Sequence, residues 1–129
     1  MMSEMILAID QGTTGTTVAL INQDGSLVSS VSNEIPQFFP RPGWVEHDVE
    51  AIWLSVIKGI RTVLQEIRAK SSKISAIGIA NQRETSILWD RNTGAPLSRA
   101  IVWQCRRTSE FCNSLKSDGA EPLVREKTG

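Results

Sequence analysis

The sequence is poor in the residues that build metal centres and disulfide frameworks. Its 129 residues include one histidine, His47, and two cysteines, Cys105 and Cys112. These are too few nitrogen and sulfur ligands for a transition-metal site, and a Ser/His nucleophile would have to use His47. The two thiols match neither a zinc spacing nor a disulfide framework, so we predict reduced packing residues. For His47, in a loop rich in Pro and Gly, we expect a structural hydrogen bond.

An excess of charge and long apolar runs are also absent. Fourteen basic and fourteen acidic residues cancel, and no Lys/Arg-rich block occurs. We therefore expect neither nucleic acid nor an anionic membrane surface as a partner. The longest apolar stretches are only as long as a strand, and no basic region opens the chain, which argues against a membrane span and a signal peptide. The prediction is a cytoplasmic protein of one domain that binds a small molecule.

The order of the apolar runs predicts an α/β fold with a mixed sheet. The pair Asp24-Gly25 is a strong hairpin signal, so the first three strands should form an antiparallel meander. The run 74–80 is almost entirely apolar, which predicts a strand covered on both faces. Between them, Asp48 can cap a helix that crosses from the meander to that strand. Strands are expected at 5–9, 16–21, 26–35, 74–80, 87–89 and 101–103, and helical segments at 52–67, 107–116 and 122–126.

The turn Asp10-Gln11-Gly12-Thr13-Thr14-Gly15 between two apolar runs has the composition of a phosphate cradle. Gly12 and Gly15 permit backbone angles that bulkier residues resist, and Thr13 and Thr14 add hydroxyl donors. Asp10 would repel a phosphate unless a divalent cation lay between them, so the turn indicates a nucleotide bound with Mg²⁺. An ordinary hairpin loop rich in Gly and Thr is an equally good interpretation of this motif alone.

A second polar segment, Asn81-Gln82-Arg83-Glu84-Thr85, follows the predicted buried strand. Open α/β sheets bind ligands at such strand ends. Arg83 donates in a fixed fork and Glu84 accepts from hydroxyls, so the two could bind a polyol without leaving a net charge. Trp103 could lie against the carbon side of that ligand. The alternatives are core packing for Trp103 and, for the charged pair, an exposed ion pair of about 0 to 1 kcal/mol.

Four motifs together resemble the N-terminal part of the glycerol kinases, within the FGGY family of carbohydrate kinases. They are DQGTTG at 10–15, PGWVEHD at 42–48, NQRET at 81–85 and IVWQCRRT at 101–108. The resemblance implies a ribonuclease-H-like, actin-like fold with two lobes and ATP between them. It also implies transfer of the γ-phosphoryl group of Mg-ATP to glycerol, giving glycerol 3-phosphate. The whole chain, 1–129, would form the N-terminal part of the first lobe.

Site roles follow from the same resemblance. It implies that Asp10 lies near Mg²⁺ and that the turn 12–15 holds the phosphates of ATP. Arg83, Glu84 and Trp103 match the positions that hold glycerol in that family. No residue of this chain matches the catalytic base, which would lie beyond its last residue.

The chain departs from the family pattern in two ways. Thr17 stands where glycerol kinases commonly have an Arg that helps to hold phosphate, and family members are several times longer. We therefore expect a truncated chain with negligible kinase activity and an exposed apolar surface. A homo-oligomer is compatible with a full-length parent. Two alternatives stay open, namely a kinase for another polyol or sugar and a non-catalytic module that binds a nucleotide or a polyol.

Overall fold

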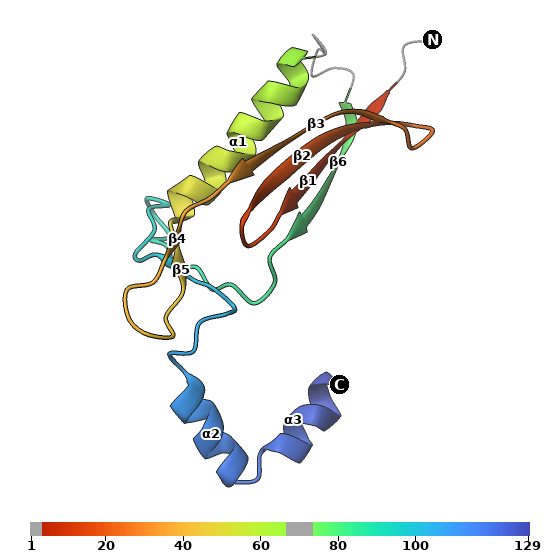
Figure 1. The fold of residues 1–129 in the computed structure, drawn as a ribbon. Coiled ribbons are helices and arrows are strands. Elements are labelled where there is room, and N and C mark those ends of the chain that lie inside the picture. Colours follow the sequence, from red (N-terminus) through yellow and green to blue (C-terminus); the bar gives the residue numbers. More distant parts are fainter. Residues whose placement is uncertain (1–3, 67–73) are drawn as a thin grey trace.

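The computed structural model describes residues 4–66 and 74–129 (Figure 1). A four-stranded sheet carries helix α1 on one face, and a smaller three-stranded sheet lies at one end of it. The elements are β1 Met5–Gln11, β2 Gly15–Asn22, β3 Leu27–Glu34, β4 Gln37–Phe38, β5 Glu46–His47, α1 Val49–Glu66, β6 Ile74–Asn81, β7 Ala100–Ile101, α2 Ser109–Ser117 and α3 Glu121–Thr128.

The large sheet has the strand order β3-β2-β1-β6. β1 pairs with β2, and β2 with β3, in antiparallel register, whereas β1 and β6 run parallel. The predicted meander and mixed sheet are therefore confirmed. At the β2–β3 turn the amide of Gly25 donates to the carbonyl of Asn22 at 3.0 Å, and Gly25 has a φ of 85°, which glycine adopts without the steric cost of a side chain.

The core lies between this sheet and α1. Alternate residues of β1 and β2, such as Leu7 and Val18, point to the helix and are buried. On the helix, Val63 is fully buried and Gly59 lies against Val18. Asp48 caps α1 as predicted, because its Oδ1 accepts the amide of Glu50 at 2.9 Å. The last apolar residue of the predicted helical stripe, at position 67, lies outside the described residues.

The prediction that strand 74–80 is covered on both faces is wrong. Ile77 and Ile79 on β6 are 60% and 70% exposed. The physical reason is the position of α1, which packs mainly over β2 and β3, while β6 is the edge strand on the other side of β1. β6 is therefore a parallel edge strand with apolar side chains in solvent.

The predicted strand at 87–89 is also wrong. Ser86 and Trp89 form only isolated bridges, with Ile101 and Pro96 respectively. Pro96 has no amide hydrogen, so it cannot extend a ladder opposite Trp89. The strand predicted at 101–103 is shifted to β7, Ala100–Ile101.

The small sheet was not predicted, because its segments lie in the loop rich in Pro and Gly. β5 is its central strand and pairs with β4 and with β7 in antiparallel register. His47 is thus part of a strand and not of a loop, and its side chain is fully buried.

Helices α2 and α3 form a pair beyond the small sheet, away from the large one (Figure 1). Both were predicted, although α3 extends over more residues than the turn expected there. Cys112 on α2 is exposed, so its predicted packing role is wrong, whereas Cys105 is half-buried. Neither thiol is in a disulfide.

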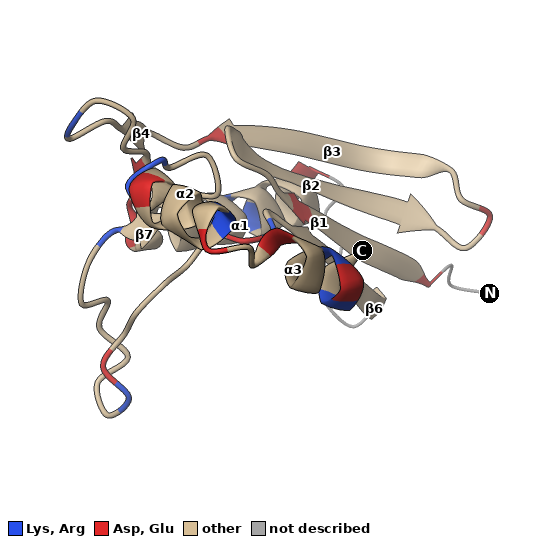
Figure 2. Cartoon of the chain, turned by 90° about the horizontal axis from the view of Figure 1, so that it is seen from below, with Lys and Arg blue, Asp and Glu red and all other residues tan. Residues whose placement is uncertain are grey.

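Basic and acidic residues are interspersed along the described chain (Figure 2). In the described ranges, no helix is both long and apolar enough to cross a membrane.

Candidate functional site

The two polar segments singled out in the sequence lie side by side. β1 and β6 are parallel neighbours. The segments at their carboxyl ends, 10–15 and 81–85, therefore lie at the same end of the sheet. The amide of Gln82 donates to the carbonyl of Gln11 at 2.7 Å and joins the segments directly.

One pocket of about 370 Å³ lies between these segments. We call it the acceptor pocket. It brings together the three residues predicted to hold a polyol with one end of the phosphate turn. Its lining residues are Gly12, Thr13, Asn81, Gln82, Arg83, Glu84 and Trp103.

Trp103 forms a wall of the acceptor pocket and does not pack in the core. Its side chain is 52% exposed, and its indole Nε1 donates to Thr13 Oγ1 at 2.9 Å. Of the two interpretations left open by the sequence, core packing is therefore excluded. The hydrogen bond ties the segment after β7 to the phosphate turn.

Glu84 has an unusual backbone. Its φ is 63°, the only positive φ outside glycine among the described residues. A side chain in this left-handed region costs of the order of 1 to 2 kcal/mol, and such strain clusters at ligand sites. Arg83 and Glu84 form no ion pair with each other in the described part of the chain, which argues against the exposed-pair interpretation.

A second pocket, of about 340 Å³, lies on the other side of the turn. We call it the phosphate pocket. Among the described residues, its wall carries two carboxylates, Asp10 and Glu34, and no lysine or arginine. Thr17 donates to or accepts from Ser32 across the strand pair at 2.8 Å. The lining residues are Asp10, Gly12, Thr14, Gly15, Thr17, Ser32, Asn33 and Glu34.

The turn therefore separates the two pockets, and Gly12 lines both. Asp10, Thr14 and Gly15 face the phosphate pocket, whereas Thr13 faces the acceptor pocket.

The two glycines of the turn do not adopt the special backbone angles predicted for them. Neither Gly12 nor Gly15 has a positive φ. A Cβ on Gly15 would lie 2.5 Å from the carbonyl oxygen of Asn33, so glycine is needed for close packing of β2 on β3. The amide of Gly12 donates to the carbonyl of Gly15 at 2.9 Å, inside the turn, and so is not available to a ligand.

A partly buried hydrogen-bond network beside the acceptor pocket was not predicted from the sequence. Gln11 Nε2 donates to the Gly12 carbonyl at 2.8 Å, and Gln82 Nε2 lies 3.3 Å from Gln11 Oε1 and 3.3 Å from His47 Nδ1. Thr85 donates to Gln82 Oε1 at 3.1 Å. The hydrogen bond expected for His47 thus exists, and its partner is Gln82, 35 positions away.

Burial favours the neutral form of the His47 imidazole. Burial lowers its pKa below the ordinary value, because the charged form loses hydration. Its Nε2 is buried and has no hydrogen-bond partner among the described residues.

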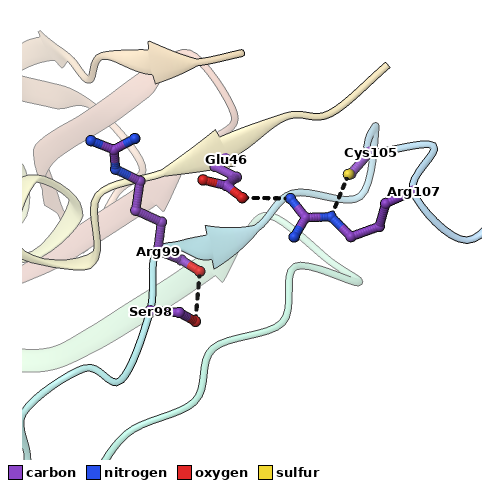
Figure 3. A network of polar contacts seen from close by, with 5 residues as sticks. All are labelled: Glu46, Ser98, Arg99, Cys105 and Arg107. Atoms are coloured by element: carbon purple, nitrogen blue, oxygen red, sulfur yellow. Dashed lines mark hydrogen bonds and ion pairs between the residues drawn. The ribbon is translucent and has the colours of Figure 1, made fainter. Parts of the chain in front are cut away.

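A second network fixes the segment that carries Trp103 (Figure 3). Arg107 Nη2 lies 2.6 Å from Glu46 Oε1 on β5, and Arg107 Nε donates to Cys105 Sγ at 3.0 Å. The same guanidinium lies 3.9 Å from the centroid of the Trp44 ring. Burial opposes ionisation of the Cys105 thiol, but the side-chain hydrogen bond from Arg107, two backbone hydrogen bonds and the Arg107 charge together lower its pKa. Glu46 precedes His47 on β5, so this one strand contributes a residue to each of the two networks.

Comparison with known proteins places this geometry in a family. Residues 5–129 match the N-terminal domain of the FGGY family of carbohydrate kinases. The chain is 51% identical over 128 residues to a glycerol kinase of Geobacillus kaustophilus (strain HTA426), covering 99% of this chain and 26% of that protein. A glycerol kinase of Oceanobacillus iheyensis is 50% identical over 129 residues, again covering 26% of the relative. The chain thus spans about a quarter of the length of these relatives.

Solved structures agree on the fold. The Plasmodium falciparum glycerol kinase with ADP superposes with a TM-score of 0.80 at 34% identity, covering 89% of this chain and 23% of that one. A gluconate kinase from Lactobacillus acidophilus gives 0.86 at 27% identity, covering 95% and 24%. The predicted fold, a lobe of the ribonuclease-H-like, actin-like class, is confirmed by these neighbours.

Proposed function

Because the chain belongs to the FGGY family of carbohydrate kinases, we propose that its parent transfers the γ-phosphoryl group of Mg-ATP to glycerol and forms glycerol 3-phosphate. The observation that carries this proposal is identity of about half over essentially the whole chain to relatives named glycerol kinase. We assign residues 1–129 to the N-terminal part of the first lobe. Within that lobe, the two pockets that meet at Gly12 would hold acceptor and phosphates.

On the acceptor side, we assign glycerol to Arg83, Glu84 and Trp103. The guanidinium donates to hydroxyl oxygens, the carboxylate accepts hydroxyl protons, and the indole covers the carbon chain. The two charges cancel, which suits a neutral polyol. Support comes from the shared pocket and from the backbone strain at Glu84.

On the phosphate side, we assign the nucleotide phosphates to Thr13, Thr14 and the turn around them, with Gly12 and Gly15 shaping it. Thr14 faces the phosphate pocket, whereas the Thr13 hydroxyl accepts from Trp103 and lies toward the acceptor. Donors placed on both sides of a transferred group would orient it for in-line attack.

The residues present fit Mg²⁺ as a partner of the nucleotide. Asp10 is an exposed carboxylate in the phosphate pocket, and no cluster of three metal-ligating side chains occurs in the described ranges. Mg²⁺ usually takes one or two carboxylates and completes its shell with phosphate oxygens and water. Asp10 would hold the ion, and the ion would neutralise phosphate charge. Since ATP is the cytoplasmic phosphoryl donor, we place the protein in the cytoplasm.

None of these residues is assigned as the base that accepts the glycerol proton. The chain would bind and orient, and we propose that it is inactive without the rest of the kinase.

A kinase for another polyol or sugar is the second candidate. The gluconate kinase and a xylulose kinase from Lactobacillus acidophilus superpose with TM-scores of 0.86 and 0.85, above the value for the glycerol kinase of Plasmodium falciparum. Backbone shape therefore does not discriminate between acceptors.

The test is ADP release from Mg-ATP with glycerol, xylulose or gluconate, on this chain and on the longest reading frame that contains it. We expect the long form to turn over glycerol and the short form to be silent. Turnover of xylulose or gluconate instead would select the second candidate.

A further inference from the structure

The direction of each hydrogen bond in this partly buried network follows from one group that can only accept. The Gly12 carbonyl can only accept, so the group of Gln11 that faces it at 2.8 Å must be the amide NH₂. Gln11 Oε1 then faces Gln82, and only the NH₂ of Gln82 can donate to it, at 3.3 Å. That NH₂ has two hydrogens, and the second points to His47 Nδ1, also at 3.3 Å.

His47 Nδ1 must therefore accept. A neutral imidazole that accepts at Nδ1 carries its hydrogen at Nε2. A proton on Nδ1 would face the Gln82 NH₂, donor against donor, and the network would break there. Burial favours the neutral imidazole over the imidazolium, and the hydrogen-bond partner at Nδ1 selects between the two neutral tautomers.

Other polar atoms of Gln82 also form hydrogen bonds. Its side-chain Oε1 accepts from Thr85 at 3.1 Å, and its backbone N–H donates to the Gln11 carbonyl at 2.7 Å. Gln82 is thus fixed on all sides, directly before Arg83 and Glu84. The contact to His47 is the only one of these that comes from the small sheet.

We propose that His47 is a positioning residue: as the Nε2–H tautomer it holds Gln82 and thereby sets Arg83 and Glu84 against the phosphate turn. The kinetic part of this proposal rests on the proposed function, whereas the tautomer does not. Without the hydrogen-bond acceptor at His47 Nδ1, Gln82 would lose one of its contacts next to the acceptor pocket. Gln11 keeps its own bond to Gly12, so the phosphate side is disturbed less.

The tautomer is tested on the chain itself, where His47 is the sole histidine. A two-bond ¹H–¹⁵N correlation spectrum distinguishes Nδ1–H, Nε2–H and the imidazolium. We expect Nε2–H at neutral pH. In Gln82→Glu the neighbouring carboxylate only accepts, so we expect the proton at Nδ1. Nδ1–H in the unsubstituted chain, or no change in Gln82→Glu, would overturn the proposal.

The positioning role is tested by steady-state kinetics on the longest reading frame that contains the chain. In His47→Asn the side-chain Oδ1 can take the place of Nδ1, whereas in His47→Gln, closer to histidine in volume, the amide lies at the Nε2 position. We expect His47→Gln to raise the KM for glycerol about tenfold, with the KM for ATP changed less than about threefold. His47→Asn should recover most of that loss.

Equal damage by both variants on both substrates, or better rescue by Gln than by Asn, would mean that His47 only fills space and would overturn the proposal. If the unsubstituted long form does not phosphorylate glycerol, the proposed function fails, while the tautomer experiment still decides the network.

Discussion

Trp103 Nε1 donates to Thr13 Oγ1 at 2.9 Å, which joins two residues 90 positions apart. One belongs to the wall of the acceptor pocket and the other to the phosphate turn. The bond fixes where the indole lies relative to the point at which the two pockets meet. The acceptor pocket is therefore shaped by the same turn that would hold the phosphates.

This pair can be tested by a double-mutant cycle on the long reading frame. Thr13→Val removes the acceptor, and Trp103→Phe removes the donor but keeps an aromatic ring. A hydrogen bond of this kind contributes about 0.5 to 1.5 kcal/mol, so each single variant should raise the KM for glycerol severalfold. The double variant should be no worse than Trp103→Phe alone. Strictly additive losses would show that the two residues act independently.

The strain at Glu84 predicts a conflict between stability and binding. Glu84→Gly relieves the positive φ, and we expect it to raise the free energy of unfolding by up to about 1 kcal/mol while it abolishes glycerol binding. Glu84→Gln keeps a side chain at this φ and should give no such gain. Urea unfolding measures both variants. An equal effect of the two would contradict the assignment of strain to this backbone.

Gly59 predicts a reversal of the usual helix propensity. In a helix interior, Gly→Ala normally stabilises by about 1 kcal/mol. A Cβ on Gly59 would lie 2.5 Å from Val18 Cγ2, and Val18 is fully buried and stiff, so overpacking of about 1 to 3 kcal/mol should outweigh that gain. Gly59→Ala should therefore lower the thermal midpoint. Gly78→Ala on β6 is the matched control, because its Cβ would meet nothing within 4 Å.

His47 predicts how stability depends on pH. Its pKa is lowered by burial in the folded chain, so between that pKa and the unfolded value near 6.5 the unfolded chain binds more protons. The free energy of unfolding should thus rise with pH in this window and fall as the pH drops below about 6.5. Hydrogen bonds from Ser26 and Thr93 lower the pKa values of Asp24 and Asp90, so these carboxylates change the free energy of unfolding only at more acidic pH.

Urea unfolding at about pH 5.5 and about pH 7.5 measures this slope. His47→Asn should flatten it, since asparagine does not titrate. The same slope in both proteins would assign the effect to other groups.

Local sequence patterns predicted the meander, α1 and the two polar segments, because alternation and capping act between near neighbours. Leu7 and Val18 alternate with less buried residues, and Asp48 caps the next helix. The prediction for the run at 74–80 was wrong, because apolar composition shows only what a strand could bury. Whether α1 reaches β6 depends on tertiary packing.

The two segments of the site were predicted, but the hydrogen bonds and the ion pair that hold them in place were not. The contacts of His47 with Gln82 and of Arg107 with Glu46 join residues 35 and 61 positions apart. Histidine and glutamine occur in many loops, and nothing local marks them as partners. Only the pairing of β5 with β7, and of β1 with β6, brings them together.

The turn 10–15 divides the proposed phosphate side of the site from the acceptor side. The direct measurement is the KM for glycerol and for Mg-ATP of Asp10→Asn and Arg83→Lys in the longest reading frame. Arg83→Lys loses the two-pronged donor and should raise the KM for glycerol about tenfold with little change for ATP, whereas Asp10→Asn should do the reverse. If each variant changes both constants alike, the two pockets are not separate binding sites for glycerol and Mg-ATP.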